Sequence, residues 1–242
     1  MACIELWRVR IGLLSPAMAL HWGVLDASEQ QRASQFRNEA DRERFVVARA
    51  TLRNLLGRHL RVRSERVAFE NNAFGKPFLA GQATGPAALH FNTSHSGDWV
   101  LHAFSLQAAV GVDVEAISLE PVAIADYEGV LAPEELQRLR ALPQAQQAGE
   151  FTAIWVAKEA YAKALGRGVS TNFAGMCVSP CVAGRQQLLY DRNESDSHQH
   201  GTLLPVDMGR GYAACLACLG AMPEVRIFDY LQTGSSMQHE AV

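Results

Sequence analysis

The sequence predicts an α/β protein of the α+β kind, built from two halves of similar outline. Two long helical patterns lie at residues 41–60 and 150–165, one in each half. Several short strand patterns accompany each of them, which predicts a long helix packed on a small, mostly antiparallel sheet in each half. The 242 residues, 48% of them hydrophobic, suffice for one large domain or two small ones with a sizeable core.

The first half is predicted to comprise residues 1–108. Its strand patterns span residues 4–11, 67–70, 89–92 and 99–105. Its helical patterns span residues 28–37 and 41–60, and in the longer one arginines occupy the face opposite the apolar residues. Polar, turn-rich loops are predicted at residues 71–77 and 93–98.

The second half is predicted to comprise residues 109–231. Its helical patterns span residues 122–130, 133–142 and 150–165, and a glycine-flanked turn ends the last of them. Its strand patterns span residues 109–115, 176–182, 186–190, 211–219 and 225–230. The polar residues 191–201 are predicted to form a loop, and residues 232–242 are predicted to form a flexible tail.

Charge and hydropathy exclude two classes of partner. Because 22 lysines and arginines stand against 25 acidic residues, the net charge gives no reason to expect nucleic acid. No apolar run reaches the length of about 18 residues that a membrane span requires. Arginines are nevertheless concentrated between Arg32 and Arg66. This concentration suggests an anionic ligand, although solvated helix faces would explain it equally.

The five cysteines indicate a reducing compartment, because their number is odd and no signal-peptide pattern precedes them. We therefore expect a cytoplasmic protein. Cys215 and Cys218 have a spacing found in zinc sites, but residues three apart on a strand face opposite sides. Buried thiols are the favoured interpretation.

Three carboxylates form the strongest candidate site. Asp113 and Glu115 are the only polar residues of an apolar strand pattern, and residues two apart on a strand face the same side. Glu159 lies on the long helix of the second half, on one stripe with Lys163. An all-oxygen set suits Mg²⁺, which is usually completed by water and substrate phosphates. The alternative is a buried ion-pair network in which Lys158 or Lys163 neutralises the acids.

Two loops carry groups that suit a phosphate. Phe74-Gly75-Lys76-Pro77 presents a lysine on a rigid turn. Asn92-Thr93-Ser94-His95-Ser96 offers hydroxyls, an imidazole and backbone amides between two apolar strands. A Ser-His nucleophile pair is the alternative, but adjacent residues rarely form one and no Gly-x-Ser-x-Gly turn is present. Anion binding is therefore favoured.

Taken in order, four segments resemble the 4′-phosphopantetheinyl transferases of the Sfp type. They are the two loops just described, Gly111-Val-Asp-Val-Glu115, and Trp155-Val-Ala-Lys-Glu-Ala-Tyr-Ala-Lys163, which Gly166-Arg-Gly168 follows. The resemblance runs from about residue 36 to about residue 219. It implies a monomer of two similar halves related by a pseudo-twofold axis, with coenzyme A in the cleft between them.

The resemblance also implies a reaction. The phosphopantetheine arm of coenzyme A would be transferred to a serine of an acyl, peptidyl or aryl carrier protein, and adenosine 3′,5′-bisphosphate would leave. The implied Mg²⁺ ligands are Asp113, Glu115 and Glu159. The implied phosphate and adenosine contacts are Lys163, His95, Ser94, Lys76 and Arg44. The serine proton would pass to Glu159 or to a water held by Glu135, and Lys158 would orient Glu159 or serve the structure.

Two other functions stay open at this stage. A metal-dependent hydrolase of coenzyme A or a nucleotide would use the same carboxylates with water as the nucleophile. A coenzyme A-binding or carrier-binding protein without turnover would have little need for a costly carboxylate cluster. Residues 127–142 are the predicted carrier-protein contact, through Leu131, Leu136 and Leu139, although core packing would also explain these leucines.

Overall fold

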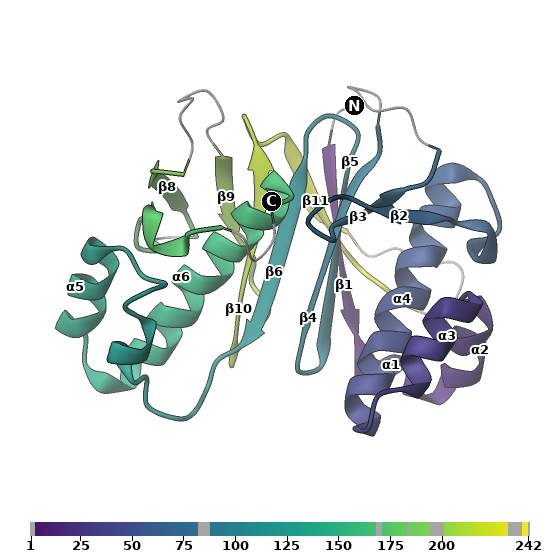
Figure 1. The fold of residues 1–242 in the computed structure, drawn as a ribbon, viewed down its shortest axis with the longest axis horizontal. Helices are drawn as coiled ribbons and strands as arrows, with labels where there is room; N and C mark the ends of the chain where they lie inside the picture. Colours follow the sequence, from purple (N-terminus) through teal and green to yellow (C-terminus); the bar gives the residue numbers. More distant parts are fainter. Residues whose placement is uncertain are drawn as a thin grey trace.

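The computed structural model describes residues 3–81, 88–167, 171–182, 184–193, 201–231 and 239–241. Two five-stranded sheets lie side by side at the centre of the molecule, with helices at both ends (Figure 1). The predicted α/β class with two similar halves is confirmed. Gly168 and the His-containing part of the predicted 191–201 loop lie outside the described residues.

The first sheet has the strand order β12-β11-β1-β5-β4. Its first-half strands are β1 (Cys3–Arg10), β4 (His90–Ser96) and β5 (Trp99–Ser105). β11 (Glu224–Asp229) pairs in parallel with β1, and β12 (His239–Ala241) pairs with β11. This sheet therefore includes residues that the sequence pattern placed in the second half and in the tail. Tail residues 232–238 and 242 lie outside the described residues.

The second sheet is antiparallel and has the order β6-β10-β9-β8-β7. Its strands are β6 (Val110–Ala116), β7 (Met176–Val178), β8 (Gln186–Asp191), β9 (Gly201–Pro205) and β10 (Tyr212–Leu219). β9 was not predicted. A separate hairpin, β2 (Phe69–Asn71) and β3 (Pro77–Leu79), carries the predicted Gly-Lys-Pro turn.

Two long helices accompany the sheets, as predicted. α4 (Glu39–Leu60) begins after Asn38, whose side chain accepts a hydrogen bond from the Ala40 amide. α6 (Gln144–Leu165) ends at Gly166, which has the left-handed conformation that favours glycine. The shorter helices are α1 (Ile11–Leu14), α2 (Met18–Val24), α3 (Ala27–Ser34) and α5 (Pro133–Ala141).

Three differences from the predicted helices stand out. The sequence pattern missed α1 and α2, and the predicted helix at 122–130 is only a short 3₁₀ turn, η3 (Ile124–Tyr127). The remaining 3₁₀ turns are η1 (Ser15–Ala17), η2 (Ser64–Arg66) and η5 (Phe173–Gly175). No helix in the described ranges is both long and apolar enough to cross a membrane.

The packing forms four layers. Between the sheets, one face of β1, including Leu6, packs against the valines of β6, such as Val112. The leucines of α4 pack on the other face of the first sheet, around Phe104. The alanines of α6 pack on the other face of the second sheet, around Cys215. Each sheet thus has one face toward its partner sheet and one toward its own long helix, which leaves β4 and β6 adjacent at the junction (Figure 1).

Candidate active site between the two halves

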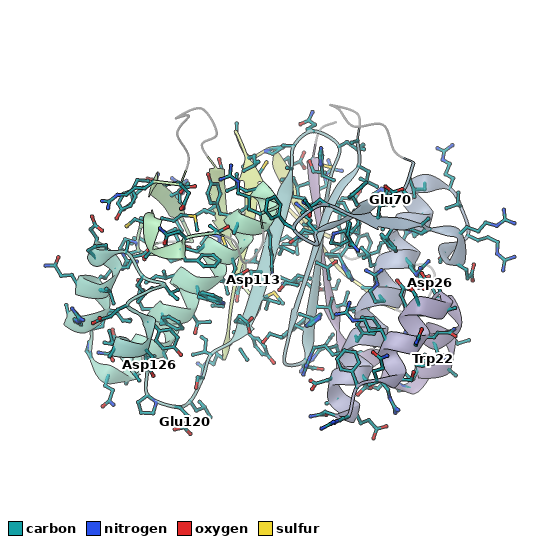
Figure 2. All side chains as sticks on the ribbon, viewed as in Figure 1. Trp22, Asp26, Glu70, Asp113, Glu120 and Asp126 are labelled. Carbon is teal, nitrogen blue, oxygen red and sulfur yellow. The ribbon has the colours of Figure 1, made fainter. Side chains whose placement is uncertain are left out.

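A pocket of about 440 Å³ lies at this junction. The first half contributes Arg49 from α4 and His95 from β4, whereas the second half contributes Asp113 and Glu115 from β6 and Glu159 from α6. Asp113 is labelled near the centre of the molecule in Figure 2. The structure therefore brings the three predicted carboxylates together in one pocket with residues of both halves.

The alternation of β6 explains why both strand carboxylates face the pocket. Val112 and Val114 point into the core between the sheets. Asp113 and Glu115, which lie on the opposite face of the strand, are therefore directed toward α6. Gly111 precedes them at a close approach of strand and helix, because a Cβ added there would lie 2.0 Å from the Ala160 carbonyl oxygen.

The predicted helical stripe is also present. Trp155, Glu159 and Lys163 all line the pocket from α6. The Lys163 Nζ lies 2.5 Å from Asp113 Oδ1 and 3.2 Å from Ser94 Oγ. The alternative of an ion pair is thus realised for Asp113, but through one oxygen only.

Burial and like charges both act on these carboxylates. Asp113 is only 2% exposed, and its Oδ2 is buried without a hydrogen-bond partner. Burial raises the pKa of Glu115 and of Glu159, and the charge of Asp113 acts in the same direction on both. A buried carboxylate oxygen without a partner is costly, and a bound cation would remove that cost.

The donor chemistry therefore fits a hard divalent cation. Among the residues that the structure describes, no three His, Cys, Asp or Glu side chains are already grouped closely enough to hold one. Asp113 Oδ2 nevertheless has no hydrogen-bond partner, and the pKa values of Glu115 and Glu159 are raised. Both observations indicate that a positive charge at this site would stabilise the carboxylates. Oxygen-only donors favour Mg²⁺ over zinc.

Glu135 and Lys158 do not belong to this pocket. Glu135 is fully buried, accepts hydrogen bonds from the backbone amides of Ala132 and Val178, and lies 2.5 Å from the Lys158 Nζ. Lys158 is also fully buried and donates to two backbone carbonyls. The expectation that Glu135 holds a catalytic water is wrong in this geometry, because its carboxylate is already saturated and enclosed. Lys158 serves the structure.

Lys76 and Arg44 lie outside the residues that line the pocket. The Lys76 Nζ donates to the carbonyl oxygens of Lys163 and Val110, at 2.5 and 3.2 Å, and burial lowers the pKa of Lys76 to about 8. Arg44 donates to the Gly97 carbonyl and pairs with Asp41. Both side chains are engaged by the protein itself, so their predicted contacts with the adenosine end remain a prediction.

The predicted loop at residues 93–98 is mostly strand, since β4 continues to Ser96 and only Gly97 and Asp98 form the turn. His95 lines the pocket, where partial burial lowers its pKa and the charges of Arg44 and Lys163 act in the same direction. Ser94 Oγ donates to Asp113 Oδ1 at 2.7 Å. The polar side chains suggested a loop, but they are accommodated because they face β6 and the pocket.

Sequence reasoning named the pocket residues Arg32 and Arg49 only within the concentration of arginines, and Asn92 only within a loop motif. The concentration of arginines was the available signal for the first two. For Asn92 the signal was the alternation of Asn92, Ser94 and Ser96, which on a strand places three polar side chains on one face.

A second, more apolar pocket of about 450 Å³ adjoins the first and shares Glu115 and Trp155 with it. Tyr127 and Phe151 contribute to its wall. The predicted carrier contacts Leu131 and Leu139 do not, because both are buried in the core around α6. Core packing explains these two leucines.

Comparisons with known proteins assign the chain to a family. Residues 109–217 match the model of the 4′-phosphopantetheinyl transferase superfamily, and residues 15–107 match that of the 4′-phosphopantetheinyl transferase N-terminal region. The chain is 33% identical to 4′-phosphopantetheinyl transferase HetI of Nostoc sp. over 171 residues, 69% of this chain and 70% of HetI. It is 26% identical to 4′-phosphopantetheinyl transferase Sfp of Bacillus subtilis over 193 residues, 80% and 82% of the two chains.

A solved structure described as the Chronobacterium ammoniagenes ACPS-CoA complex aligns with 25% identity and a TM-score of 0.35, over 47% of this chain and 97% of that one. The sequence relationships extend over both halves of the chain and include the segments that build the pocket. The chain therefore belongs to the 4′-phosphopantetheinyl transferase superfamily and is a transferase enzyme of this type.

Proposed function

We propose that this enzyme transfers the 4′-phosphopantetheine arm of coenzyme A to a serine of an acyl, peptidyl or aryl carrier protein, with Mg²⁺ as the required metal ion. The observation that carries the proposal is the pocket itself. It combines three carboxylates, one of which has a buried oxygen without a partner, with Lys163 and His95. Acidic groups for a metal and basic groups for phosphates are the two requirements of phosphoryl transfer.

Asp113, Glu115 and Glu159 would hold the metal. Bound Mg²⁺ supplies positive charge that stabilises the phosphoryl oxygens and the leaving group. Lys163 already lies between β6 and α6 with its ammonium directed at the pocket wall, and it would provide a second positive charge for the pyrophosphate. His95 would add a hydrogen bond from the opposite half.

Transfer requires a bond between the carrier serine oxygen and the β-phosphorus of coenzyme A, and cleavage of the bond from that phosphorus to the bridging oxygen. Adenosine 3′,5′-bisphosphate leaves with the bridging oxygen. We assign the serine proton to Glu159, because this carboxylate faces the pocket from α6. Glu135 is not a candidate for this role.

We further propose that the enzyme acts as a monomer in the cytoplasm, with residues 1–108 and 109–231 as its functional halves. β11 of the second half is then part of the sheet of the first half. One chain supplies the pocket residues of both halves, which supports a monomer. The five cysteines are free thiols, which is compatible with the proposed reducing compartment.

The test is intact-mass analysis of apo carrier proteins incubated with the enzyme, coenzyme A and Mg²⁺. We expect a gain of about 340 Da, the mass of the transferred arm, that disappears with EDTA. Asp113→Asn should lower the rate roughly 100-fold or more, because the metal loses an anionic ligand. Asp229→Asn is the matched control, since Asp229 forms its ion pair with Arg8 outside the pocket.

Other outcomes would replace the proposal. Release of adenosine 3′,5′-bisphosphate without any mass gain on a carrier would indicate a hydrolase. Binding of coenzyme A with neither product would indicate a binding protein. Full transfer by Asp113→Asn would remove the metal assignment while leaving the transfer reaction in place.

A further inference from the structure

Two edge strands of different sheets are joined by side chains rather than by a shared sheet. β4 and β6 run alongside each other, and three β4 side chains accept hydrogen bonds from backbone amides of β6. Asn92 Oδ1 accepts from Val112 at 2.8 Å, Ser94 Oγ from Val114 at 3.4 Å, and Ser96 Oγ from Ala116 at 3.0 Å. Partners are twenty residues apart in every case. We call Asn92, Ser94 and Ser96 the side-chain ladder.

Two members of the ladder also contact the carboxylates. Ser94 Oγ donates to Asp113 Oδ1 at 2.7 Å, and Ser96 Oγ donates to Glu115 Oε2 at 2.8 Å. A hydroxyl has one proton, and the backbone amide occupies an acceptor position of each oxygen. The direction of both bonds is therefore determined: each serine accepts from the strand and donates to the carboxylate next to it.

The third member lacks this second contact. The position that corresponds to Asp113 and Glu115 in the ladder is occupied by Gly111, which has no side chain. Asn92 therefore binds β6 without holding a carboxylate, whereas Ser94 and Ser96 do both. Asn92 can therefore serve as a control, because its replacement removes a hydrogen bond to β6 without removing one to a carboxylate.

We propose that Ser94 and Ser96 are positioning residues that hold Asp113 and Glu115 for a divalent cation. Each serine binds one oxygen of its carboxylate, and in Asp113 the other oxygen is left buried and without a partner. The two serines are on β4 of the first sheet, and their hydroxyls also accept hydrogen bonds from backbone amides of β6. The carboxylates of β6 are therefore held in a fixed orientation relative to both sheets. This inference rests on the proposed function, since it concerns the metal of that site.

Ser96 offers the cleaner test of the two. Ser94 also accepts a hydrogen bond from Lys163, so its removal would disturb a cation as well as a carboxylate. The contacts described for Ser96 are with the strand amide and with Glu115. Ser96 is partly buried.

The experiment measures Mn²⁺ binding to the full chain by the loss of the free-ion paramagnetic resonance signal, with the melting temperature in EDTA as a second readout. We expect Ser96→Ala to weaken Mn²⁺ binding roughly tenfold, the lower end for loss of a group that orients a metal ligand. Ser96→Thr retains the hydroxyl, so its affinity for Mn²⁺ should lie within about twofold of the wild type. Valine has the shape of threonine without the hydroxyl, so the affinity of Ser96→Val should resemble that of Ser96→Ala.

Asn92→Ala separates the two roles of the ladder. It should lower the melting temperature, because the Val112 amide loses its partner, but leave Mn²⁺ binding near that of the wild type. Equal weakening of Mn²⁺ binding in Asn92→Ala and Ser96→Ala, or wild-type binding in both Ser96→Ala and Ser96→Val, would overturn the proposal. If Ser96→Ala does not fold, the comparison of Ser96→Thr with Ser96→Val decides.

The proposed function fails in a different way. If the wild-type protein binds no Mn²⁺, the metal assignment fails and the positioning role fails with it. If the wild-type binds Mn²⁺ but modifies no carrier protein, the proposed reaction fails while the comparison among the serine variants still decides the positioning role.

Discussion

Replacing Gly111 by alanine should separate β6 from α6 and damage the site at its base. A Cβ at this position would lie 2.0 Å from the Ala160 carbonyl oxygen and 2.4 Å from the Ala164 amide nitrogen. Both are backbone atoms of a helix, so neither can rotate away. Because ordinary contact begins near 3.4 Å, strand and helix would have to move apart by about 1.4 Å.

Such a displacement is costly in a packed interior. Overpacking typically costs 1–3 kcal/mol, and the upper part of this range applies where backbone must move, so we expect a loss of about 3 kcal/mol in the free energy of unfolding. For a chain of this size that corresponds to a fall in melting temperature of roughly 6 to 12 °C. Asp113 follows Gly111 by two residues and Glu159 precedes Ala160, so Mn²⁺ binding should weaken as well.

Urea denaturation at 25 °C and thermal melting, both in EDTA, measure the effect. Gly149→Ala is the matched control, because Gly149 lies in α6 and an added Cβ would meet nothing within 4 Å. That variant should gain up to about 1 kcal/mol, the difference in helix propensity between alanine and glycine. A change below about 0.5 kcal/mol in Gly111→Ala would refute the close approach as the reason for this glycine.

Two further predictions concern Lys158 and Lys76. Lys158→Met leaves the Glu135 carboxylate buried without its cation, so we expect a loss of about 3–5 kcal/mol in urea denaturation; a loss below about 1 kcal/mol would contradict the ion-pair explanation. Burial lowers the pKa of Lys76 from 10.5 to about 8, so the folded chain loses this proton at a lower pH than the unfolded chain does. The melting temperature of the wild type should therefore rise relative to Lys76→Met between pH 8 and pH 10, and parallel profiles would show that Lys76 is not desolvated.

The sequence was sufficient to predict which side chains share one face of a single strand or helix. Alternation along β6 placed Asp113 and Glu115 on one face, and helical spacing placed Glu159 and Lys163 on one stripe of α6. Both inferences follow from the fixed periodicity of strand and helix, which every residue of the element shares. The order of the motifs along the chain then identified the family.

The same reasoning failed where a side chain meets a distant part of the chain. Glu135 was expected to hold a catalytic water, yet its carboxylate pairs with Lys158 in the core. Lys76, on a turn suited to phosphate, donates to a carbonyl oxygen in the last turn of α6, a contact that the turn by itself did not indicate. A local pattern shows that a side chain lies on a turn or a helix, but it does not show which distant group that side chain contacts.

Local pattern was informative about strands but silent about their partners. The alternation in β11 predicts a strand, yet nothing in it indicates pairing with β1, more than two hundred residues earlier in the chain. Asn92, Ser94 and Ser96 likewise form a recognisable alternation, whereas their contact with β6 exists only because two sheets pack with their edges adjacent. Periodicity is a property of the local backbone and can be deduced from neighbouring residues, but partners are selected by the packing of the whole chain, which no short segment contains.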